Sequence, residues 1–312
     1  MADVKKIATR EGYGSALVEM GAIHPELVVL DADLAAATKT AVFGKAYPDR
    51  HINCGIAEAN MVGIAAGLAT VGKIPFASSF AMFATGRAYE QIRNSIGYPR
   101  LNVKIAASHA GITVGEDGAS HQCNEDIALM RTIPEMVVVN PSDNIEAIAA
   151  VKAAVEYDGP MYLRFGRAPV PIINDNDDYK FELGKGVLLK DGTDLTIVAT
   201  GICVSSALEA AERLEKEGIS TQVINIHTIK PLDEEIIINA AKKTKKIVTA
   251  EEHSVIGGLG SAVAELLAEK EPTLLKRIGV YDVYGESGSA ANLLIKYKLD
   301  GDGLYEQIKE WI

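Results

Sequence analysis

The chain has 312 residues, enough for two domains of ordinary size, and a formal net charge of −11. Hydrophobic residues make up 48 % of it and charged residues 23 %, which is typical of a soluble globular protein. The acidic balance argues against nucleic acids and acidic membrane surfaces as partners.

The cysteines and the first residues bear on the cellular compartment. Cys54, Cys123 and Cys203 form neither a CxxC pair nor a zinc-ligand spacing, which suits a reducing cytoplasm. Residues 1–7 contain no apolar segment of the kind found in signal peptides. No apolar run has both the length and the flanks of a membrane span. We therefore expect a cytoplasmic protein that does not cross a membrane.

The chain opens with a predicted helix and a predicted buried strand. Residues 10–23 carry apolar side chains on one side, as an amphipathic helix does. Arg10 stands at the helix start, where the helix dipole disfavours a cation, so either an anionic ligand or simple exposure to solvent explains it. Residues 27–30 are continuously apolar and predict a central parallel strand. Asp33 follows this strand, at the sheet edge where ligands gather.

Residues 52–72 form the most apolar stretch and contain a single acidic residue, Glu58. A helix that is apolar all round is buried all round, so we expect a core helix here. Gly63 and Gly67 have the spacing that lets another backbone approach closely. Because an ionised carboxylate would be costly to desolvate in such a helix, we expect Glu58 to keep its proton and donate a hydrogen bond. The alternative is a solvent-facing glutamate that caps the helix.

Two further strands end beside aromatic or polar side chains. Residues 73–77 predict a short strand, and Phe80 and Phe83 follow it with a spacing that brings two rings together on a turn or helix. The two rings are either a binding patch or ordinary core aromatics. Residues 103–108 predict the next strand, and the segment 109–122 follows it directly.

The segment 109–122 has the sequence His-Ala-Gly-Ile-Thr-Val-Gly-Glu-Asp-Gly-Ala-Ser-His-Gln, which is typical of a loop built for polar contacts. Its glycines let the backbone approach a ligand. His109 and His121 are able to donate hydrogen bonds to a carbonyl or phosphate oxygen. Metal binding is a less favoured alternative, because the two histidines lack a regular ligand spacing.

Residues 136–139 and 161–165 predict two more strands, with a helix at 144–156 between them. Arg164 and Arg167 close this unit. The guanidinium of either suits a phosphate or carboxylate ligand, and equally suits a surface ion pair.

A polar segment at 174–178 marks the boundary between two domains. We assign residues 1–173 to the first domain, 174–190 to a linker and 191–312 to the second domain. Strands alternate with helices in both, which predicts an α/β fold with two domains, each a mostly parallel sheet flanked by helices. The strands expected in the second domain are 195–199, 221–226, 246–250 and 279–283, and its expected helices are 204–217, 233–242, 258–269 and 303–311.

The second domain also has a glycine-rich junction between a strand and a helix. Glu251-Glu252-His253 ends the strand, and Gly257-Gly258-Leu259-Gly260 precedes the helix. A helix N-terminus in such a place is able to hold an anion.

Three motifs together carry a family resemblance. Gly55-Ile56-Ala57-Glu58, the loop 109–122 and Gly257-Gly258-Leu259-Gly260 resemble the C-terminal half of transketolase, and the resemblance extends over the whole chain. It implies a pyrimidine-binding domain followed by a transketolase C-terminal domain. The diphosphate-binding domain, with its Gly-Asp-Gly and Asn magnesium ligands, is missing. The chain therefore resembles the C-terminal subunit of a split transketolase.

One short segment resembles a motif of the missing diphosphate-binding domain. Gly301-Asp302-Gly303 resembles the start of the thiamine diphosphate fingerprint, but that fingerprint needs an Asn some tens of residues later, and the sequence ends at Ile312. We predict a turn at this segment.

The resemblance implies roles for individual residues. Glu58 matches a glutamate that donates to the pyrimidine ring of thiamine diphosphate, the cofactor that carries a two-carbon unit from a ketose to an aldose. Glu58 and His121 are the expected catalytic residues. The other matches are Phe80 and Phe83 in the pyrimidine pocket, Asp33 near the cofactor, His109, Asp117 and His121 at the sugar, and Arg10 at the sugar phosphate.

The expected phosphate site departs from the family pattern. Ala37 takes the place of a phosphate-binding serine, with Thr38 next to it. The second phosphate-binding arginine of the family corresponds to either Arg164 or Arg167.

The resemblance also implies partners. A separate diphosphate-binding subunit would hold Mg²⁺, and no metal site is expected in this chain. We expect a homodimer of this chain flanked by two such subunits, an α2β2 assembly, acting on sugar phosphates in the pentose phosphate pathway.

Two other enzymes and one non-enzyme are alternatives. Deoxyxylulose-phosphate synthase has a similar His-Ala-Gly loop, but in one long chain with the diphosphate-binding domain. The β subunit of 2-oxoacid dehydrogenases is a separate chain whose loop differs from residues 114–122. A catalytically silent binding or regulatory module is the third alternative. The joint presence of Glu58, His109, Asp117 and His121 argues against silence.

Overall fold

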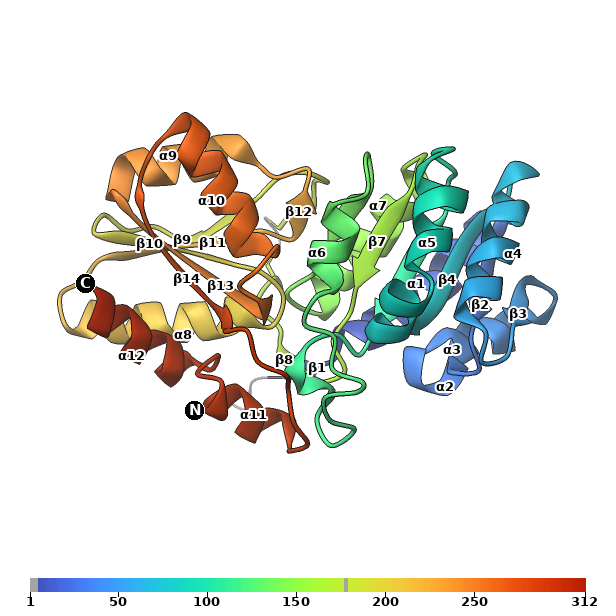
Figure 1. Cartoon of the computed structure of the whole chain (residues 1–312), viewed down its shortest axis with the longest axis horizontal. Coiled ribbons are helices and arrows are strands. Elements are labelled where there is room, and N and C mark those ends of the chain that lie inside the picture. Colours follow the sequence, from blue (N-terminus) through green and yellow to red (C-terminus); the bar gives the residue numbers. More distant parts are fainter. Residues whose placement is uncertain (1–4, 177–178) are drawn as a thin grey trace.

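A computed structural model describes residues 5–176 and 179–312, which form two α/β domains side by side (Figure 1). Residues 1–4 of the expected first domain lie outside the described part, as do the last two residues of the polar segment 174–178. Within the described residues, no helix is long and apolar enough to cross a membrane.

The first domain is built on a seven-stranded sheet in the order β12-β6-β7-β5-β4-β2-β3. Its neighbouring strands are parallel except for β12, which is antiparallel to β6. The strands are β2 (Leu27–Asp31), β3 (His51–Asn53), β4 (Ile74–Phe80), β5 (Lys104–Ser108), β6 (Val137–Val139), β7 (Met161–Arg164) and β12 (Thr228–Lys230).

Helices cover both faces of this sheet, because its strands are apolar on both sides. The helices α1 (Thr9–Ile23), α3 (Thr40–Ala46) and α7 (Asn144–Glu156) enclose one core, which contains Tyr13 and Phe76. The other face is covered by α4 (Glu58–Thr70), the π-helical turns η2 (Met82–Arg87) and η3 (Ile92–Gly97), and α6 (Asp126–Arg131). The short helix α5 (Tyr89–Gln91) lies between η2 and η3, and the short helix α2 (Ala35–Thr38) packs beside α3.

The second domain contains a five-stranded sheet in the order β14-β13-β10-β11-β9, parallel except for β9. Helices α8 and α12 lie on one side of it, and α9 and α10 on the other (Figure 1). The strands are β9 (Val187–Lys190), β10 (Leu195–Ala199), β11 (Thr221–Asn225), β13 (Lys246–Ser254) and β14 (Leu274–Val280). The helices are α8 (Cys203–Lys216), α9 (Glu234–Thr244), α10 (Leu259–Lys270), α11 (Ala290–Lys296) and α12 (Gly301–Trp311).

The predicted fold class is confirmed, with several local differences. Strand β9 lies within the segment that we expected to be a linker. Strand β14 covers Leu274–Val280 and overlaps the predicted 279–283 only at its last two residues, because its first residues are partly exposed and lack a continuous apolar pattern. Gly301 to Gly303 begin helix α12 instead of forming a turn, since the Asp300 carboxylate accepts from the Gly303 N–H at 3.0 Å and caps the helix.

Helix α4 departs from the prediction in a more informative way. It begins only at Glu58, and residues 51–53 before it form β3. The prediction that the helix is buried on every side is wrong for this chain by itself, because Gly63 and Gly67 are exposed. A Cβ added at either glycine would meet no atom within 4 Å. The face of α4 that carries Ala59, Asn60, Gly63, Gly67 and Thr70 is therefore uncovered.

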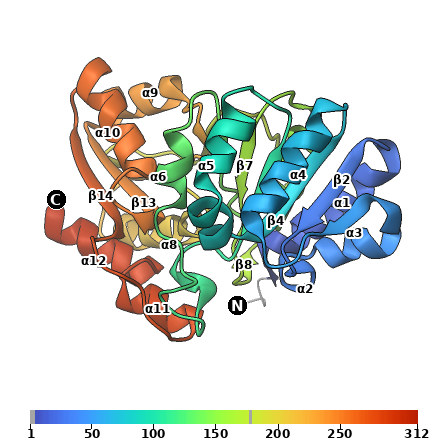
Figure 2. The ribbon, with the colours of Figure 1, turned by 45° about the vertical axis from the view of Figure 1, so that its right-hand side comes forward.

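The two domains interlock. Strand β12 follows β11 of the second sheet in the chain, yet it pairs with β6 at the edge of the first sheet. A two-stranded ladder joins β1 (Lys6–Ile7) to β8 (Val170–Pro171) close to the junction. Helix α11 packs on the loop 109–122 of the first domain (Figure 2).

Candidate active site

The predicted site residues gather at the carboxyl edge of the first sheet. Phe80 is the last residue of β4, and His109 follows the last residue of β5. Asp33 follows β2 and accepts a hydrogen bond from Asn53 Nδ2 at 3.0 Å. These strands are adjacent in the sheet, so side chains remote in sequence come together at one edge.

An aromatic and imidazole cluster lies at the centre of this edge. The Phe80 ring stacks on the His109 ring with centroids 3.8 Å apart, and Phe83 lies 6.0 Å from Phe80 at an interplanar angle of 19°. The His121 ring meets Phe83 edge-on at 5.2 Å. The sequence prediction that Phe80 and Phe83 form one patch is confirmed, and the same patch joins both histidines of the loop.

Glu58 is the first residue of α4, yet its side chain is buried, so it does not face solvent. Ser79 Oγ donates to its Oε1 at 3.4 Å, and Arg87 Nη1 lies 3.4 Å from Oε2. Arg87 also stacks over the Phe83 ring at 4.1 Å. The expected all-apolar surroundings of Glu58 are therefore wrong. The carboxyl group has one hydroxyl donor and one cation beside it.

Arg10 connects the helix α1 start to the histidine cluster. Its Nη1 donates to the Ala37 carbonyl at 2.9 Å and lies 3.2 Å from His109 Nε2. Burial, reinforced by the cations Arg10 and Arg167, lowers the pKa of His109 to about 3. His109 is thus a neutral imidazole, able to donate or accept a hydrogen bond at neutral pH.

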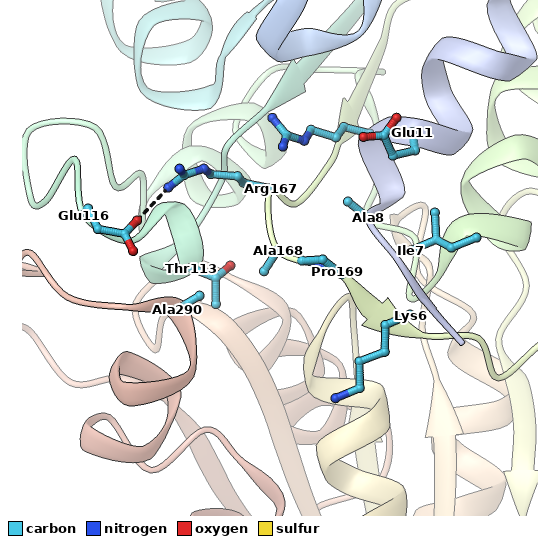
Figure 3. A pocket seen from close by; sticks show the side chains of 11 residues that line it. Lys6, Ile7, Ala8, Glu11, Thr113, Glu116, Arg167, Ala168, Pro169 and Ala290 are labelled. Atoms are coloured by element: carbon cyan, nitrogen blue, oxygen red, sulfur yellow. Dashed lines mark hydrogen bonds and ion pairs between the residues drawn. The ribbon is translucent and has the colours of Figure 1, made fainter. Parts of the chain in front are cut away.

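A cavity of about 470 Å³ opens beside Arg10 and contains the cationic side chains Lys6 and Arg167 (Figure 3). Arg167 pairs with Glu116 at 3.0 Å and donates to the Val114 carbonyl. The Ala37 methyl group cannot replace a serine hydroxyl. Thr38 does not replace it either, since its hydroxyl donates to the Leu34 carbonyl within α2.

The other predicted residues occupy distinct positions. Asp117 is exposed on the loop 109–122, beside Gly118, which faces Ser287 of the second domain. Arg164 is buried, and its Nε donates to Asp126 Oδ2 at 2.7 Å. This buried ion pair favours a structural role for Arg164. Of Arg164 and Arg167, it is Arg167 that lines the cavity beside Arg10.

The predicted anion site at the start of α10 is already filled by the chain itself. The Glu251 carboxylate accepts from the N–H groups of Leu259 at 2.7 Å and Gly260 at 2.8 Å. A Cβ on Gly258 would lie 2.0 Å from Glu251 Oε2, so glycine is needed for this close approach. The junction is a helix cap made within the protein.

Three features of the site were missed from the sequence. Arg87 stands four residues after Phe83, the spacing of one helix face, and this was the available signal. The buried Asp31 lies 2.8 Å from His51 Nε2, a contact between neighbouring strands that no local pattern reveals. Glu252 reaches the loop 109–122 from the other domain.

The edge fits one half of a thiamine diphosphate site. The flat rings of Phe80 and Phe83 beside a buried carboxyl group suit an aminopyrimidine, which needs stacking and one proton partner. A divalent cation with a diphosphate needs clustered oxygen ligands. Among the described residues there is no group of three or more His, Cys, Asp or Glu side chains that would hold a metal ion. The fold, the aromatic rings and the buried carboxyl group thus fit the pyrimidine-binding part of a thiamine diphosphate enzyme.

Comparison with known proteins gives the family. The transketolase pyrimidine-binding domain matches residues 5–172, and the transketolase C-terminal domain matches residues 184–304. The chain belongs to the transketolase family. It is 55 % identical to a transketolase C-terminal section from Methanocaldococcus jannaschii, covering 96 % of this chain and 95 % of the relative.

Two further relatives and one solved structure place the chain within the family. A 6-deoxy-6-sulfo-D-fructose transketolase subunit of Clostridium is 47 % identical over 93 % of this chain and 90 % of the relative. Rat transketolase is 38 % identical over 97 % of this chain but only 49 % of its own length. The structure of a split-gene transketolase, an inactive beta4 tetramer, has a TM-score of 0.89 at 54 % identity and covers 98 % of both chains.

Proposed function

We propose that this chain is the C-terminal subunit of a split transketolase and that it transfers a two-carbon ketol unit from a ketose phosphate to an aldose phosphate. The observation that carries the proposal is the carboxyl edge of the first sheet, where Glu58, the Phe80–Phe83 pair and the two loop histidines converge. Thiamine diphosphate, when bound, supplies the carbon nucleophile and the electron sink.

The chain's own residues then bind, orient and move protons. Glu58 would be the proton partner of the pyrimidine ring, and Phe80 and Phe83 would be the rings that pack against it. His109, neutral at pH 7, donates to or accepts from the sugar beside Arg10. His121, at the rim of the aromatic cluster, exchanges a proton with the reacting oxygen of the sugar.

The far end of the substrate belongs in the cavity of Figure 3. Arg10 and Arg167 offer planar guanidinium donors to a terminal anion, and Lys6 adds a third positive charge. The similarity to a subunit acting on a sulfonated fructose and to an apulose-4-phosphate transketolase subunit supports an anionic sugar and leaves the sugar itself to experiment.

The diphosphate end of the cofactor and its Mg²⁺ require a second subunit. No metal-holding cluster occurs within residues 5–176 and 179–312, which supports a partner that carries the magnesium ligands. The uncovered face of α4 supports self-association of this chain next to that partner, and a dimer flanked by two partner subunits is the assembly we propose.

Reconstitution tests the function directly. The purified chain is mixed with thiamine diphosphate, Mg²⁺, a ketose phosphate and an aldose phosphate, with and without the diphosphate-binding subunit. We expect ketol transfer only in the two-subunit mixture. Substantial transfer by this chain alone would overturn the split-enzyme proposal. Parallel reactions use a 6-sulfonated ketose or pyruvate as the donor. Activity with the sulfonated ketose would indicate a sulfosugar enzyme, and activity with pyruvate would indicate a 2-oxoacid enzyme.

A further inference from the structure

The loop 109–122 is held in place by the second domain. Within it, Ile112–Val114 form a 3₁₀ turn, η4, and the Thr113 N–H donates to Glu252 Oε1 at 2.6 Å. Glu252 lies on β13 of the other sheet, 139 residues further along the chain. A single buried hydrogen bond thus joins a second-domain carboxyl group to the substrate loop.

The contact is tight on both sides. A Cβ added to Gly111 would lie 2.3 Å from Glu252 Cδ, and Gly111 has a φ of +78°, so both space and backbone conformation require glycine. The Glu252 main chain is fixed too, because its carbonyl accepts from Arg164 Nη2 at 2.9 Å. The Glu252 side chain is buried. The start of the loop therefore lies against the Glu252 carboxyl group with no space for a side chain at Gly111.

Arg167 connects this loop contact to the substrate cavity. The Val114 carbonyl, one residue after Thr113, accepts a hydrogen bond from Arg167 Nη1. Thr113 and Arg167 both line the cavity of about 470 Å³, and Glu252 lines a small cavity that shares Thr113 with it. The position of the Arg167 guanidinium therefore depends on where Glu252 holds the loop.

A second attachment secures the far end of the loop. Gln122 Nε2 donates to the Glu286 carbonyl of the second domain at 2.8 Å and to the Ile112 carbonyl of its own loop at 3.0 Å. The second domain thus grips the loop at its start and its end.

We propose that Glu252 is a positioning residue for substrate binding: it fixes the Gly111–Gly115 segment, and with it Arg167, from outside the pyrimidine-binding domain. The inference rests on the proposed function for its catalytic consequence. Burial raises the pKa of Glu252 to about 7, so a neutral side chain of the same shape still offers the oxygen that Thr113 needs. Glutamine is therefore the conservative replacement.

Hydrogen exchange tests the structural half without any assay of activity. We expect Glu252→Ala to speed amide exchange in peptides covering 109–122 by ten-fold or more, and Glu252→Gln to restore most of the protection. The matched control is Glu251→Ala, whose carboxyl group caps α10 and does not touch the loop. In that variant the faster exchange should appear at the start of α10 instead.

Kinetics of the complex with the diphosphate-binding subunit test the catalytic half. Glu252→Ala should lower kcat/KM for the ketose phosphate by about 10²-fold, the size of a displaced positioning group, mainly by raising KM. Cofactor affinity should stay near that of the unaltered protein, and Glu252→Gln should recover most of the lost activity. If the unaltered complex transfers no ketol unit, the proposed function is wrong. The hydrogen-exchange experiment still tests whether Glu252 positions the loop 109–122.

Two outcomes would overturn the proposal. One is unchanged exchange in 109–122 when Glu252→Ala is folded. The other is a faster-exchanging loop with an unchanged KM for the ketose phosphate. Where the alanine variant does not fold, Glu252→Asp replaces it, because the shorter carboxyl group withdraws from the Thr113 N–H while keeping the acid.

Discussion

Glu58 is buried, with 4 % of the residue exposed, and the Arg87 guanidinium lies 3.4 Å from its carboxyl group. A carboxyl group that donates a proton to a pyrimidine nitrogen must itself carry that proton at the moment of donation. Arg87 is half exposed and stacks on Phe83, so a ring that enters beside Phe83 would compete with it.

Replacement of Glu58 tests this role. Glu58→Gln should bind thiamine diphosphate with little loss in the two-subunit complex but lower turnover by at least about 10²-fold, because an amide is a poor proton donor. Exchange of the thiazolium proton with solvent measures the step directly. Exchange as fast as in the unaltered complex would contradict the assignment. Glu212→Gln, the same change at an exposed position of α8 in the second domain, is the control.

His121 provides the second test at this scale. His121→Ala should lower kcat/KM for the sugar by about 10²-fold, since a positioned proton donor or acceptor is lost, while cofactor affinity stays near normal. Steady-state kinetics and a cofactor titration on the same preparation separate the two effects. Lost cofactor binding with intact sugar kinetics would make His121 a structural residue of the aromatic cluster.

Residue chemistry was predictable where one segment carried the whole signal. The loop 109–122 and the lone acid Glu58 were recognisable from the composition of their own segments. The structure brings both to the carboxyl edge of the first sheet. Arg164 was ambiguous, because its partner Asp126 lies 38 residues away and only the fold joins them. The Thr113–Glu252 bond spans two domains, so no local pattern reveals it.

At the scale of elements, α4 has an uncovered face with two glycines, and a Cβ added at either one would point into open space. Gly63→Leu and Gly67→Leu should leave the fold of the single chain intact, since the new side chains meet open space and leucine favours helix more than glycine does. The same changes should weaken self-association, because a bulky side chain prevents close approach of a second backbone.

Light scattering during size-exclusion chromatography measures that effect, with thermal unfolding as a check on folding. Glu212→Leu, which adds the same apolar side chain to an exposed position of α8, is the matched control. An unchanged oligomer in both glycine variants would show that the α4 face is not an interface.

Elements were predicted well where the pattern was regular. Helix α7 has the predicted bounds, and its N-cap Asp143 accepts from the Glu146 N–H. Strand β10 also has its predicted bounds, since it is buried on both faces. Strands β9 and β12 were missed because they are short edge strands, which are defined by pairing with a remote neighbour.

For the whole molecule, buried acids at the domain junction predict a dependence of stability on pH. Burial raises the pKa of Glu252 from its usual 4.5 to about 7 in the folded protein. Below pH 4.5 folded and unfolded chains both hold the proton. Above it the unfolded chain ionises first, so stability is lost as the pH rises to 7, by up to roughly 3 kcal/mol for this group.

Glu252→Gln removes this contribution, because glutamine does not ionise. The free energy of unfolding of the variant, relative to the unaltered chain, should therefore rise between pH 5 and pH 8. Urea unfolding at a series of pH values provides the measurement. A difference that does not change with pH would show that the carboxyl group is already ionised in the folded state.

Strand β12 has a consequence for any attempt to divide the chain. It covers the outer side of β6 with antiparallel pairs, Thr228 to Val139 and Lys230 to Val138. A cut in the segment between the domains would expose β6 as a bare edge of three valines, a template for pairing with other molecules. We therefore expect the isolated first domain to precipitate on expression. An experiment that replaces this protein with that of another organism should then exchange the whole chain and not one domain.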